Sequence, residues 1–226
     1  MELYEKETIT CEEMKQLEKM AASKGLSTYE MMENAGTEAA KIILGKCPEA
    51  IRNPRAVVFC GKGNNGGDGL VVARKLNEAG WATVVVLVEG NPATEDAKKN
   101  YDLIKDKLEI LDRREVPASG GFDIVVDAIY GTGFHGELRE AGKAAVEAIN
   151  KMGYQKAIVF AMDIPSGISG DDTGRDEPKN CVTADYTITF HSKKPVHDNP
   201  RMTDLIGNVI VVNIGIKEIL KETNYE

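Results

Sequence analysis

The chain has 226 residues, with 28 Lys and Arg against 36 Asp and Glu, which makes its formal net charge −8. A composition of 42% hydrophobic and 28% charged residues is typical of a globular protein and excludes an intrinsically disordered one. No stretch approaches the roughly 20 apolar residues of a membrane helix, and residues 1–7 lack the apolar core of a signal peptide. The acidic balance argues against nucleic acid as the main partner. We therefore expect a cytoplasmic protein with no membrane segment, and the length suits one large α/β domain over residues 1–226.

Two capping boxes predict two helices in the first 45 residues. Thr10 and Ser27 each precede a glutamate by three positions, which is the pattern of a capping box. Apolar residues then recur at helical spacing over 14–21 and again over 31–43. Gly25 is a natural end for the first helix, so we expect an N-terminal helical pair.

From Pro54 onward, strands and helices alternate. Apolar runs predict buried strands at 56–60 and 82–88 and further strands at 122–128, 157–162, 184–190 and 208–213. The segments 69–79, 94–107 and 137–152 read as helices, and the polar helix 94–107 is expected to expose Asn100. This order predicts a doubly wound, mostly parallel sheet with helices on both faces. Residues 168–182 form a long loop of the kind that is usually functional or mobile.

The cysteines point to a reducing compartment. Cys11, Cys47, Cys60 and Cys181 are widely spaced, with no C-x-x-C pair and no nearby pair of histidines. We interpret them as reduced thiols that mostly fill the core, and we expect no zinc site.

The first strand ends in an unusually glycine-rich turn. Residues 61–69 read Gly-Lys-Gly-Asn-Asn-Gly-Gly-Asp-Gly, so five of nine residues are glycine. Glycines let backbone amides approach an anion at a helix N-terminus, which predicts phosphate or nucleotide binding. The alternative is a tight strand-to-helix turn, although such a turn would need only one or two glycines.

Two further strand ends carry polar groups. Asp127 closes the strand 122–128 and precedes Gly131, Gly133 and Gly136, and Asp163-Ile164-Pro165-Ser166-Gly167 follows the strand 157–162. In open α/β sheets the carboxyl ends of the strands meet at the ligand site, so these groups should converge. Their oxygens suit a hard cation, and the glycine amides suit a dinucleotide's phosphates. For Asp163 the alternative is a helix cap or a loop hydrogen bond.

At these motifs the chain resembles the NAD(P)H-hydrate epimerase family, the YjeF N-terminal domain. The turn at 61–69 matches the family's signature almost residue for residue, and Met32-Glu33-Asn34-Ala35-Gly36 resembles its early helix motif. Asp127-Ala128 with Gly131-Thr132-Gly133, and the segment 163–167, match its other two motifs. The match covers nearly the whole chain and implies a Rossmann-like fold.

The resemblance also implies a function. The family interconverts the R and S forms of NADH and NADPH that carry a hydroxyl at C6 of the nicotinamide ring, so that a separate dehydratase acting on the S form can restore the cofactor. The resemblance further implies a homodimer. A non-catalytic nucleotide-binding or scaffold module of the same fold is the alternative, which would bind the hydrates without speeding their equilibration.

Carried over by motif, the resemblance assigns the binding residues. The substrate-binding residues would be Asn64, Asn65, Gly66, Gly67, Asp68, Gly131, Thr132, Gly133, Phe134, His135, Gly136, Glu137 and Asp163. A potassium ion would be held by Asn65, Asp127 and Ser166, a loose oxygen cage of low charge.

Epimerisation needs proton transfer, and the catalytic candidates are Asp163 and Lys194. Asp163 is the favoured general base because it is a carboxylate at a partly desolvated strand end. Lys194 precedes Pro195 as in the family's Lys-Pro-Gly motif, but Val196 replaces the glycine, which leaves open whether Lys193 or Lys194 reaches the substrate. The alternative for both lysines is a solvated surface turn.

Overall fold

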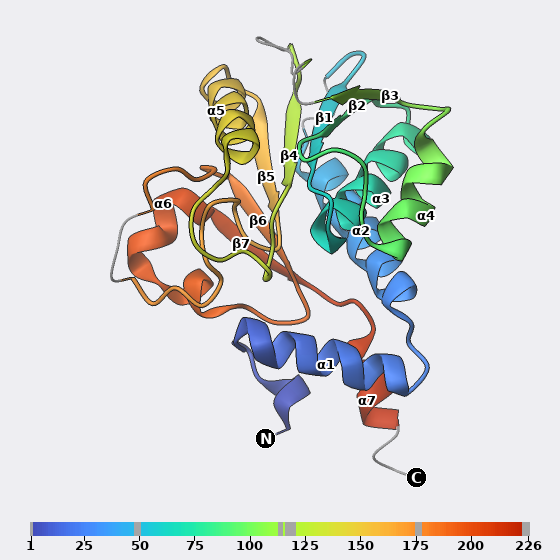
Figure 1. Ribbon diagram of the computed structural model, residues 1–226, viewed down its shortest axis with the longest axis vertical. Helices are drawn as coiled ribbons and strands as arrows, with labels where there is room; N and C mark the ends of the chain where they lie inside the picture. Colours follow the sequence, from blue (N-terminus) through green and yellow to red (C-terminus); the bar gives the residue numbers. More distant parts are fainter. Residues whose placement is uncertain (1, 48–50, 113–114, 116–120, 175–177, 223–226) are drawn as a thin grey trace.

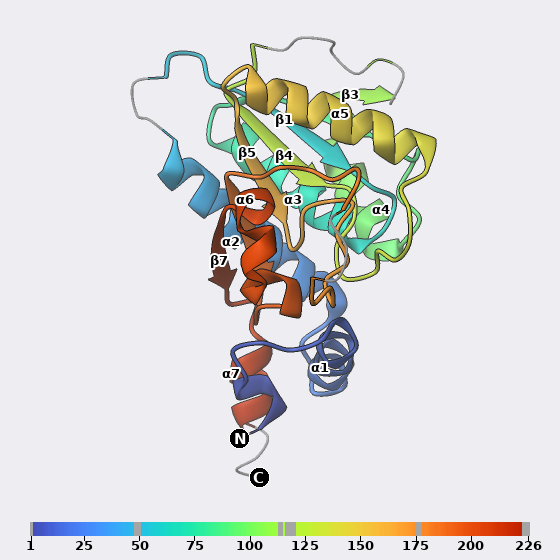
Figure 2. The same ribbon diagram turned by 90° about the vertical axis from the view of Figure 1, so that its left-hand side faces the viewer.

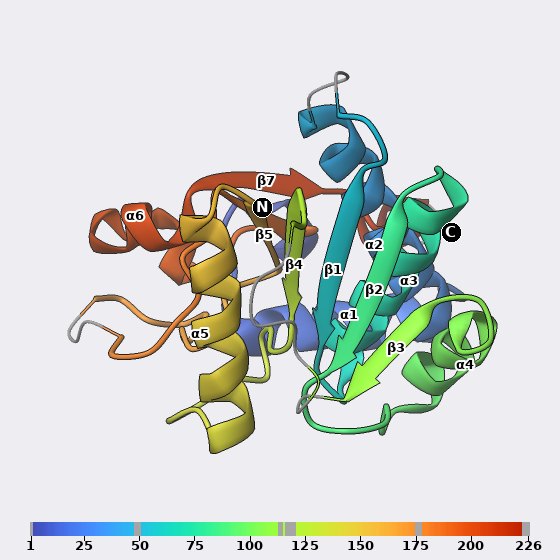
Figure 3. The same cartoon turned by 90° about the horizontal axis from the view of Figure 1, so that it is seen from above.

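A computed structural model describes residues 2–47, 51–112, 115, 121–174 and 178–222 of the protein. Seven strands in this part of the chain form one sheet in the order β3-β2-β1-β4-β5-β6-β7, and every neighbouring pair is parallel. The strands are β1 (Arg55–Cys60), β2 (Ala82–Leu87), β3 (Glu109–Asp112), β4 (Ile124–Ala128), β5 (Ile158–Met162), β6 (Tyr186–Phe190) and β7 (Asn208–Val212). The predicted Rossmann-like α/β fold is therefore confirmed (Figure 3).

Helices cover both faces of this sheet. They are α1 (Cys11–Ser23), α2 (Thr28–Lys46), α3 (Asn64–Glu78), α4 (Glu95–Ile104), α5 (Glu140–Tyr154), α6 (Thr203–Ile206) and α7 (Ile216–Glu222), with short 3-10 helices at Leu3–Glu5, Pro195–Asp198 and Pro200–Met202. Figure 1 shows α5 on one side of β4 and the group α2, α3 and α4 on the other. Within the part of the chain described, no helix has both the length and the apolar content that a bilayer span requires.

Each central strand contributes to two cores, which explains its continuous apolar run. In β1, Val58 and Cys60 belong to the core shared with α2 and α3, whereas Val57 and Phe59 belong to the core shared with α5. Side chains alternate between the faces of a strand, and both faces are covered here. The strand order reverses between β1 and β4, and a ligand crevice is expected at the carboxyl ends beside such a switch point.

Both predicted N-terminal helices are present, but they pack against different elements. Both predicted capping boxes form, at Thr10 with Glu13 and at Ser27 with Glu30. Helix α2 packs on α3 in the layer over the sheet, whereas α1 packs against α7 and the 3-10 helix at Leu3–Glu5 (Figure 2). Because α1 lies beyond the sheet layer, its polar side is free to face the carboxyl ends of the strands.

Two helix predictions need correction. Helix α3 begins at Asn64, five residues before the expected start, so two-thirds of the glycine-rich turn is helical. Asn100 of α4 is fully buried rather than exposed, and its side-chain amide lies 3.4 Å from the sulfur of Met32. The long-range contact of α4 with α2 and α3 causes this burial, and no local sequence pattern predicts it. The sequence reading also did not include β3, α6 and α7.

The cysteines are free thiols, as expected. Cys11, Cys60 and Cys181 are buried, and Cys47 is partly buried. Burial raises the pKa of Cys47 and of Cys181 to about 11. Thiols held protonated in this way are poor nucleophiles, which agrees with a packing role.

Candidate active site

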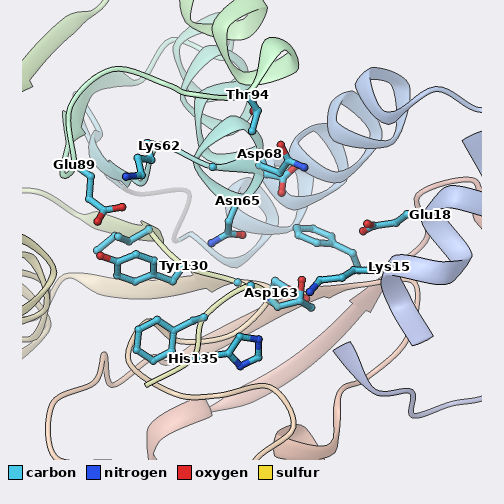
Figure 4. A pocket seen from close by; sticks show the side chains of 18 of the residues that line it. Lys15, Glu18, Lys62, Asn65, Asp68, Glu89, Thr94, Tyr130, His135 and Asp163 are labelled. Carbon is cyan, nitrogen blue, oxygen red and sulfur yellow. Dashed lines mark hydrogen bonds between the residues drawn. The ribbon is translucent and has the colours of Figure 1, made fainter. Parts of the chain in front are cut away.

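A cavity of about 590 Å³ lies at the carboxyl edge of the sheet, where the ends of β1, β4 and β5 meet the start of α3 (Figure 4). The segments after β2 and β6 complete its wall, together with Lys15 and Glu18 of α1. The volume falls in the range of pockets that enclose a large small-molecule ligand. Its position beside the switch point is the one that the topology favours.

Most of the residues predicted to bind substrate lie in this wall. They are Asn64, Asn65, Asp68, Gly131, Thr132, Gly133, Phe134, His135, Glu137 and Asp163. Among the described residues that line the cavity, Gly66, Gly67 and Gly136 do not appear. Gly136 has a φ of +82° and serves the turn that leads towards α5.

The glycines of the first motif have a packing role that the sequence reading missed. A Cβ on Gly66 would stand 1.8 Å from the backbone oxygen of Gly61, and one on Gly67 would stand 2.5 Å from the Met32 side chain. Gly66 must therefore be glycine for α3 to pack against its own turn, whereas a side chain at Gly67 would require the flexible end of Met32 to shift. The amides that remain to meet a ligand are those of the first helical turn, which begins at Asn64 in the cavity wall.

Asp163 is held in a demanding conformation at the end of β5. Its φ is +64°, in the left-handed region that non-glycine residues rarely adopt and that clusters at functional sites. Oδ1 accepts hydrogen bonds from Lys194 Nζ at 2.7 Å and Thr189 Oγ1 at 3.0 Å, and Oδ2 accepts one from Thr132 N at 3.1 Å. Burial acts to raise the pKa of Asp163, but the Lys194 ammonium outweighs it and holds the pKa below its ordinary value. The carboxylate is therefore ionised.

Lys194, rather than Lys193, reaches Asp163. Lys194 is fully buried, and its Nζ also donates to Thr189 Oγ1 and to two backbone carbonyls within 3.2 Å. It lies behind Asp163 and outside the cavity wall as far as the described residues define it. Lys193 sits on the surface and pairs with Asp198 at 2.9 Å. The surface-turn alternative thus fits Lys193 and is wrong for Lys194.

Asp127 and Ser166 tie two strand ends together beneath the cavity. Asp127 Oδ1 accepts from Ser166 Oγ at 2.6 Å and from Ile129 N at 3.2 Å, and Oδ2 accepts from Ser166 N at 2.7 Å. Ser166 Oγ in turn accepts from Tyr130 N at 3.1 Å. Complete burial raises the pKa of Asp127 to about 6 despite these hydrogen bonds. The pair fixes the turn after β4 against the turn after β5.

Asn65 is a buried polar side chain without an internal partner. Within the described residues, neither its Oδ1 nor its Nδ2 forms a hydrogen bond, although both atoms are buried. Asn65 Oδ1 and Asp163 Oδ2 stand 3.3 and 3.1 Å from the place where a Cβ on Gly131 would be. Gly131 therefore leaves room for the two side chains to approach the same point. An unsatisfied buried amide is costly, so this arrangement indicates a ligand there.

Of the other carboxyl groups in this wall, two are influenced by the charge of Asp163. Asp68 comes from α3 and Glu18 from α1. Burial, followed by the negative charges of Asp163 and Glu18, raises the pKa of Asp68 well above its ordinary value. Burial and the charge of Asp163 also raise the pKa of Glu18, against a smaller opposing effect of Lys194 and Lys15. The cavity therefore combines one carboxylate whose pKa is lowered, Asp163, with two carboxyl groups whose pKa values are raised.

Several lining residues were not foreseen from the sequence. They are Lys15, Glu18, Lys62, Gly63, Glu89, Thr94, Ile129, Tyr130, Arg139 and Phe190. Glu89 and Ile129 follow the ends of β2 and β4, and Phe190 is the last residue of β6, so the strand-end rule could have included them. Lys15 and Glu18 carried no such signal, because the polar side of an amphipathic helix normally faces solvent.

Comparison with known proteins places the chain in a family. Residues 28–196 match the family model described as YjeF-related protein N-terminus. The NAD(P)H-hydrate epimerase of Cenarchaeum symbiosum (strain A) is 37% identical over 213 residues, which cover 92% of this chain and 95% of that protein. The NAD(P)H-hydrate epimerase of Nitrosopumilus maritimus (strain SCM1) is 36% identical over 215 residues, which again cover 92% of this chain and 95% of that protein.

Longer relatives and a solved structure also match. The bifunctional NAD(P)H-hydrate repair enzyme Nnr of Archaeoglobus fulgidus is 36% identical over 212 residues, 94% of this chain but 42% of that protein. The crystal structure of the yeast protein YNL200c superposes with a TM-score of 0.76 at 23% identity, over 91% of this chain and 87% of the yeast chain, which supports the fold. With the family model spanning most of the chain, this protein belongs to the YjeF-related protein N-terminus family.

Proposed function

We propose that this protein is an NAD(P)H-hydrate epimerase, which interconverts the R and S forms of hydrated NADH and NADPH at C6 of the nicotinamide ring. The observation that carries the proposal is Asp163, an ionised carboxylate held at the cavity wall beside the unpartnered amide of Asn65. The match extends over 95% of each of the two relatives named NAD(P)H-hydrate epimerase, and these relatives support the same activity.

The proposed chemistry is a reversible ring opening. Asp163 accepts the proton of the C6 hydroxyl, the C6–O bond becomes a carbonyl, and the bond between C6 and the ring nitrogen breaks. The electron pair of that bond moves to the nitrogen, which takes up a proton and gives it back on closure. Closure of the nitrogen on the other face of the planar carbonyl yields the other epimer, and Asp163 returns the proton. Loss of hydroxide, the competing route, would begin with a proton delivered to the hydroxyl by another group, because an ionised Asp163 accepts a proton instead. Thr132 N and Lys194 orient the carboxylate for this role.

The test is the rate at which the R and S hydrates equilibrate, followed by chromatography. The wild-type protein should accelerate equilibration, and Asp163→Asn should slow it by at least tens-fold, on the scale of general-base catalysis, about 10²–10⁴. Binding of the dinucleotide should fall less than the rate. A wild-type protein that binds the hydrates without speeding their equilibration would instead be a non-catalytic binding module.

We propose in addition that Asn65, Asp127 and Ser166 hold a potassium ion. The residues fit the group: Asn65 has a buried side-chain oxygen without a partner, and one carboxylate with neutral oxygens gives a site of low charge. No group of three His, Cys, Asp or Glu side chains suited to a metal occurs among the described residues, which agrees with a donor set that is mostly neutral. The ion would anchor the turns that carry Asp163 and Asn65.

An ion that binds only the folded protein stabilises it by mass action, so potassium should raise the melting temperature at fixed ionic strength. The comparison is an equal concentration of a bulky organic cation. Asp127→Ala should abolish the potassium-specific rise and keep the general salt effect. Identical melting curves of the wild-type protein in the two salts would remove the ion site.

The remaining proposals rest on the family resemblance. We propose that the protein acts in the cytoplasm as a homodimer and supplies the S hydrate to a dehydratase. The bifunctional repair enzymes among the relatives, of which this chain matches 42%, support a link between the two activities. The molecular mass in solution, measured by light scattering, tests the dimer.

A further inference from the structure

We propose that Asp68 is the proton donor of the reaction and that Glu18, reaching in from α1, holds the proton on Asp68. This inference rests on the proposed epimerase activity and adds a second proton-transfer group to it. Nothing in the family match covers α1, because the matched residues begin at position 28.

The chemistry requires such a donor. When the bond between C6 and the ring nitrogen breaks, its electron pair moves to the nitrogen, which takes up a proton. Asp68 supplies that proton while Asp163 receives the one from the hydroxyl, so ring opening moves one proton onto Asp163 and one off Asp68. Ring closure reverses both transfers, and no proton is gained or lost overall. The Lys194 ammonium favours the ionised form of Asp163, so Asp163 is suited to receive the hydroxyl proton and Asp68 to supply the one that the nitrogen takes up.

The geometry places the two groups around one part of the cavity. Asp68, Glu18 and Asp163 all line it, from α3, α1 and the end of β5. Figure 4 shows Asp68 above the level of Asn65 and Asp163 below it, with Glu18 extending from α1. The unpartnered Asn65 amide between them marks the place as built for a polar ligand. A ring bound beside Asn65 would thus have one carboxyl group on each side.

The partners of the carboxyl groups decide which one keeps its proton. Asp163 faces an ammonium and two other donors. In the described part of the chain, the side chains of Asp68 and Glu18 form no hydrogen bond and no ion pair. Asp68 is partly buried, and an uncompensated charge that is partly withdrawn from water is costly, which favours the protonated form of Asp68. The raised pKa of Asp68 and that of Glu18, described above, agree with this division.

Glu18 acts as a positioning residue through its charge. The charged groups that influence this pair are Asp163 from β5, Lys15 from α1 and Lys194 behind Asp163, while Lys62 and His135 also line the cavity. Asp68 and Glu18 titrate as a coupled pair, in which ionisation of one opposes ionisation of the other. Glu18 therefore keeps Asp68 protonated to a higher pH than Asp68 would reach alone.

The first experiment is Asp68→Asn in the full-length protein. We expect kcat for epimerisation to fall by about 100-fold or more, the scale of lost general-acid catalysis, with a smaller change in KM. ADP-ribose binding, measured by calorimetry, reports whether the variant retains its cavity. A kcat of Asp68→Asn close to that of the wild type would overturn the assignment. A wild type without epimerase activity would refute the proposed function instead.

The second experiment uses the pH profile of kcat and does not depend on Asp68→Asn folding. Activity should decline as pH rises and Asp68 loses its proton. Glu18→Gln removes the opposing negative charge, so this alkaline limb should move to lower pH, whereas Glu18→Asp should keep it near its wild-type position. Glu12→Gln, at an exposed position of α1, is the matched control and should leave the profile unchanged. An alkaline limb that stays in place in Glu18→Gln would refute the role of Glu18.

Discussion

The buried lysine behind Asp163 offers a sharp test of how the site is held together. Lys194→Met keeps the length of the side chain and removes its ammonium, which is 1% exposed and lies 2.7 Å from Asp163 Oδ1. The substitution leaves Asp163 buried without its counter-charge. It also leaves the carbonyl oxygens of Phe190 and Ser192 without the lysine donor.

The expected loss of stability is large because the pair is buried. Breaking one side of a buried ion pair costs about 3–5 kcal/mol. For a chain of this length each kcal/mol shifts the melting temperature by roughly 2–4 °C, so the fall near neutral pH should be roughly 6–20 °C.

The loss should also depend on pH. In the wild type, the lowered pKa of Asp163 contributes stability above its unfolded pKa, and this contribution is lost as pH falls through the folded pKa. In Lys194→Met the ammonium no longer opposes burial, so the pKa of Asp163 rises and stability is lost as pH rises. The gap between the two proteins should therefore be wider at about pH 7.5 than at about pH 5.

Thermal denaturation of both proteins at the two pH values is the assay, with Lys193→Met as the matched control. Lys193 is half-exposed and pairs with a surface carboxylate, so its loss should cost about 0–1 kcal/mol. Adding Asp163→Asn to Lys194→Met should recover part of the stability near neutral pH, because the buried charge is gone. A Lys194→Met variant as stable as the control, or a pH-independent gap, would refute the buried-pair argument.

Two other expectations follow from the packing and the buried acid. Gly66→Ala should destabilise the protein by at least about 1–3 kcal/mol, because its Cβ would meet the Gly61 carbonyl. Gly45→Ala is the control: the added Cβ has open space around it, so the change should be neutral or stabilising by up to about 1 kcal/mol. Denaturant melts compare the two, and equal effects would contradict the close approach. Potassium should stabilise the protein more at about pH 7.5 than at about pH 5, because Asp127, with a pKa of about 6, must ionise to bind the ion. An equal rise in melting temperature at both pH values would mean that Asp127 is not a ligand.

The glycine-rich motif lies beside the cavity, as the sequence predicts, but phosphate approach does not explain all of its glycines. Composition placed a functional turn after β1, and the cavity is there. The sequence reading explained the glycines by phosphate approach, but Gly66 and Gly67 are inside α3, where the neighbours are Gly61 and Met32. Which atom lies opposite a missing Cβ depends on how α3 packs, and a single sequence does not contain that information.

The sequence by itself determined the parallel α/β sheet and the edge at which the site lies. Apolar runs of six or seven residues mark strands that are buried on both faces, and motifs at their carboxyl ends must converge, because parallel strands end at the same edge. That reasoning brings Asn65, Asp127 and Asp163 to one edge without any structure. Only the tertiary structure decided that Lys194 lies behind Asp163 and that α1 brings Glu18 into the cavity. The physical reason is sequence distance: Lys194 is 31 residues and Glu18 is 145 residues from Asp163 along the chain. Both reach the site through tertiary packing, which local periodicity does not encode.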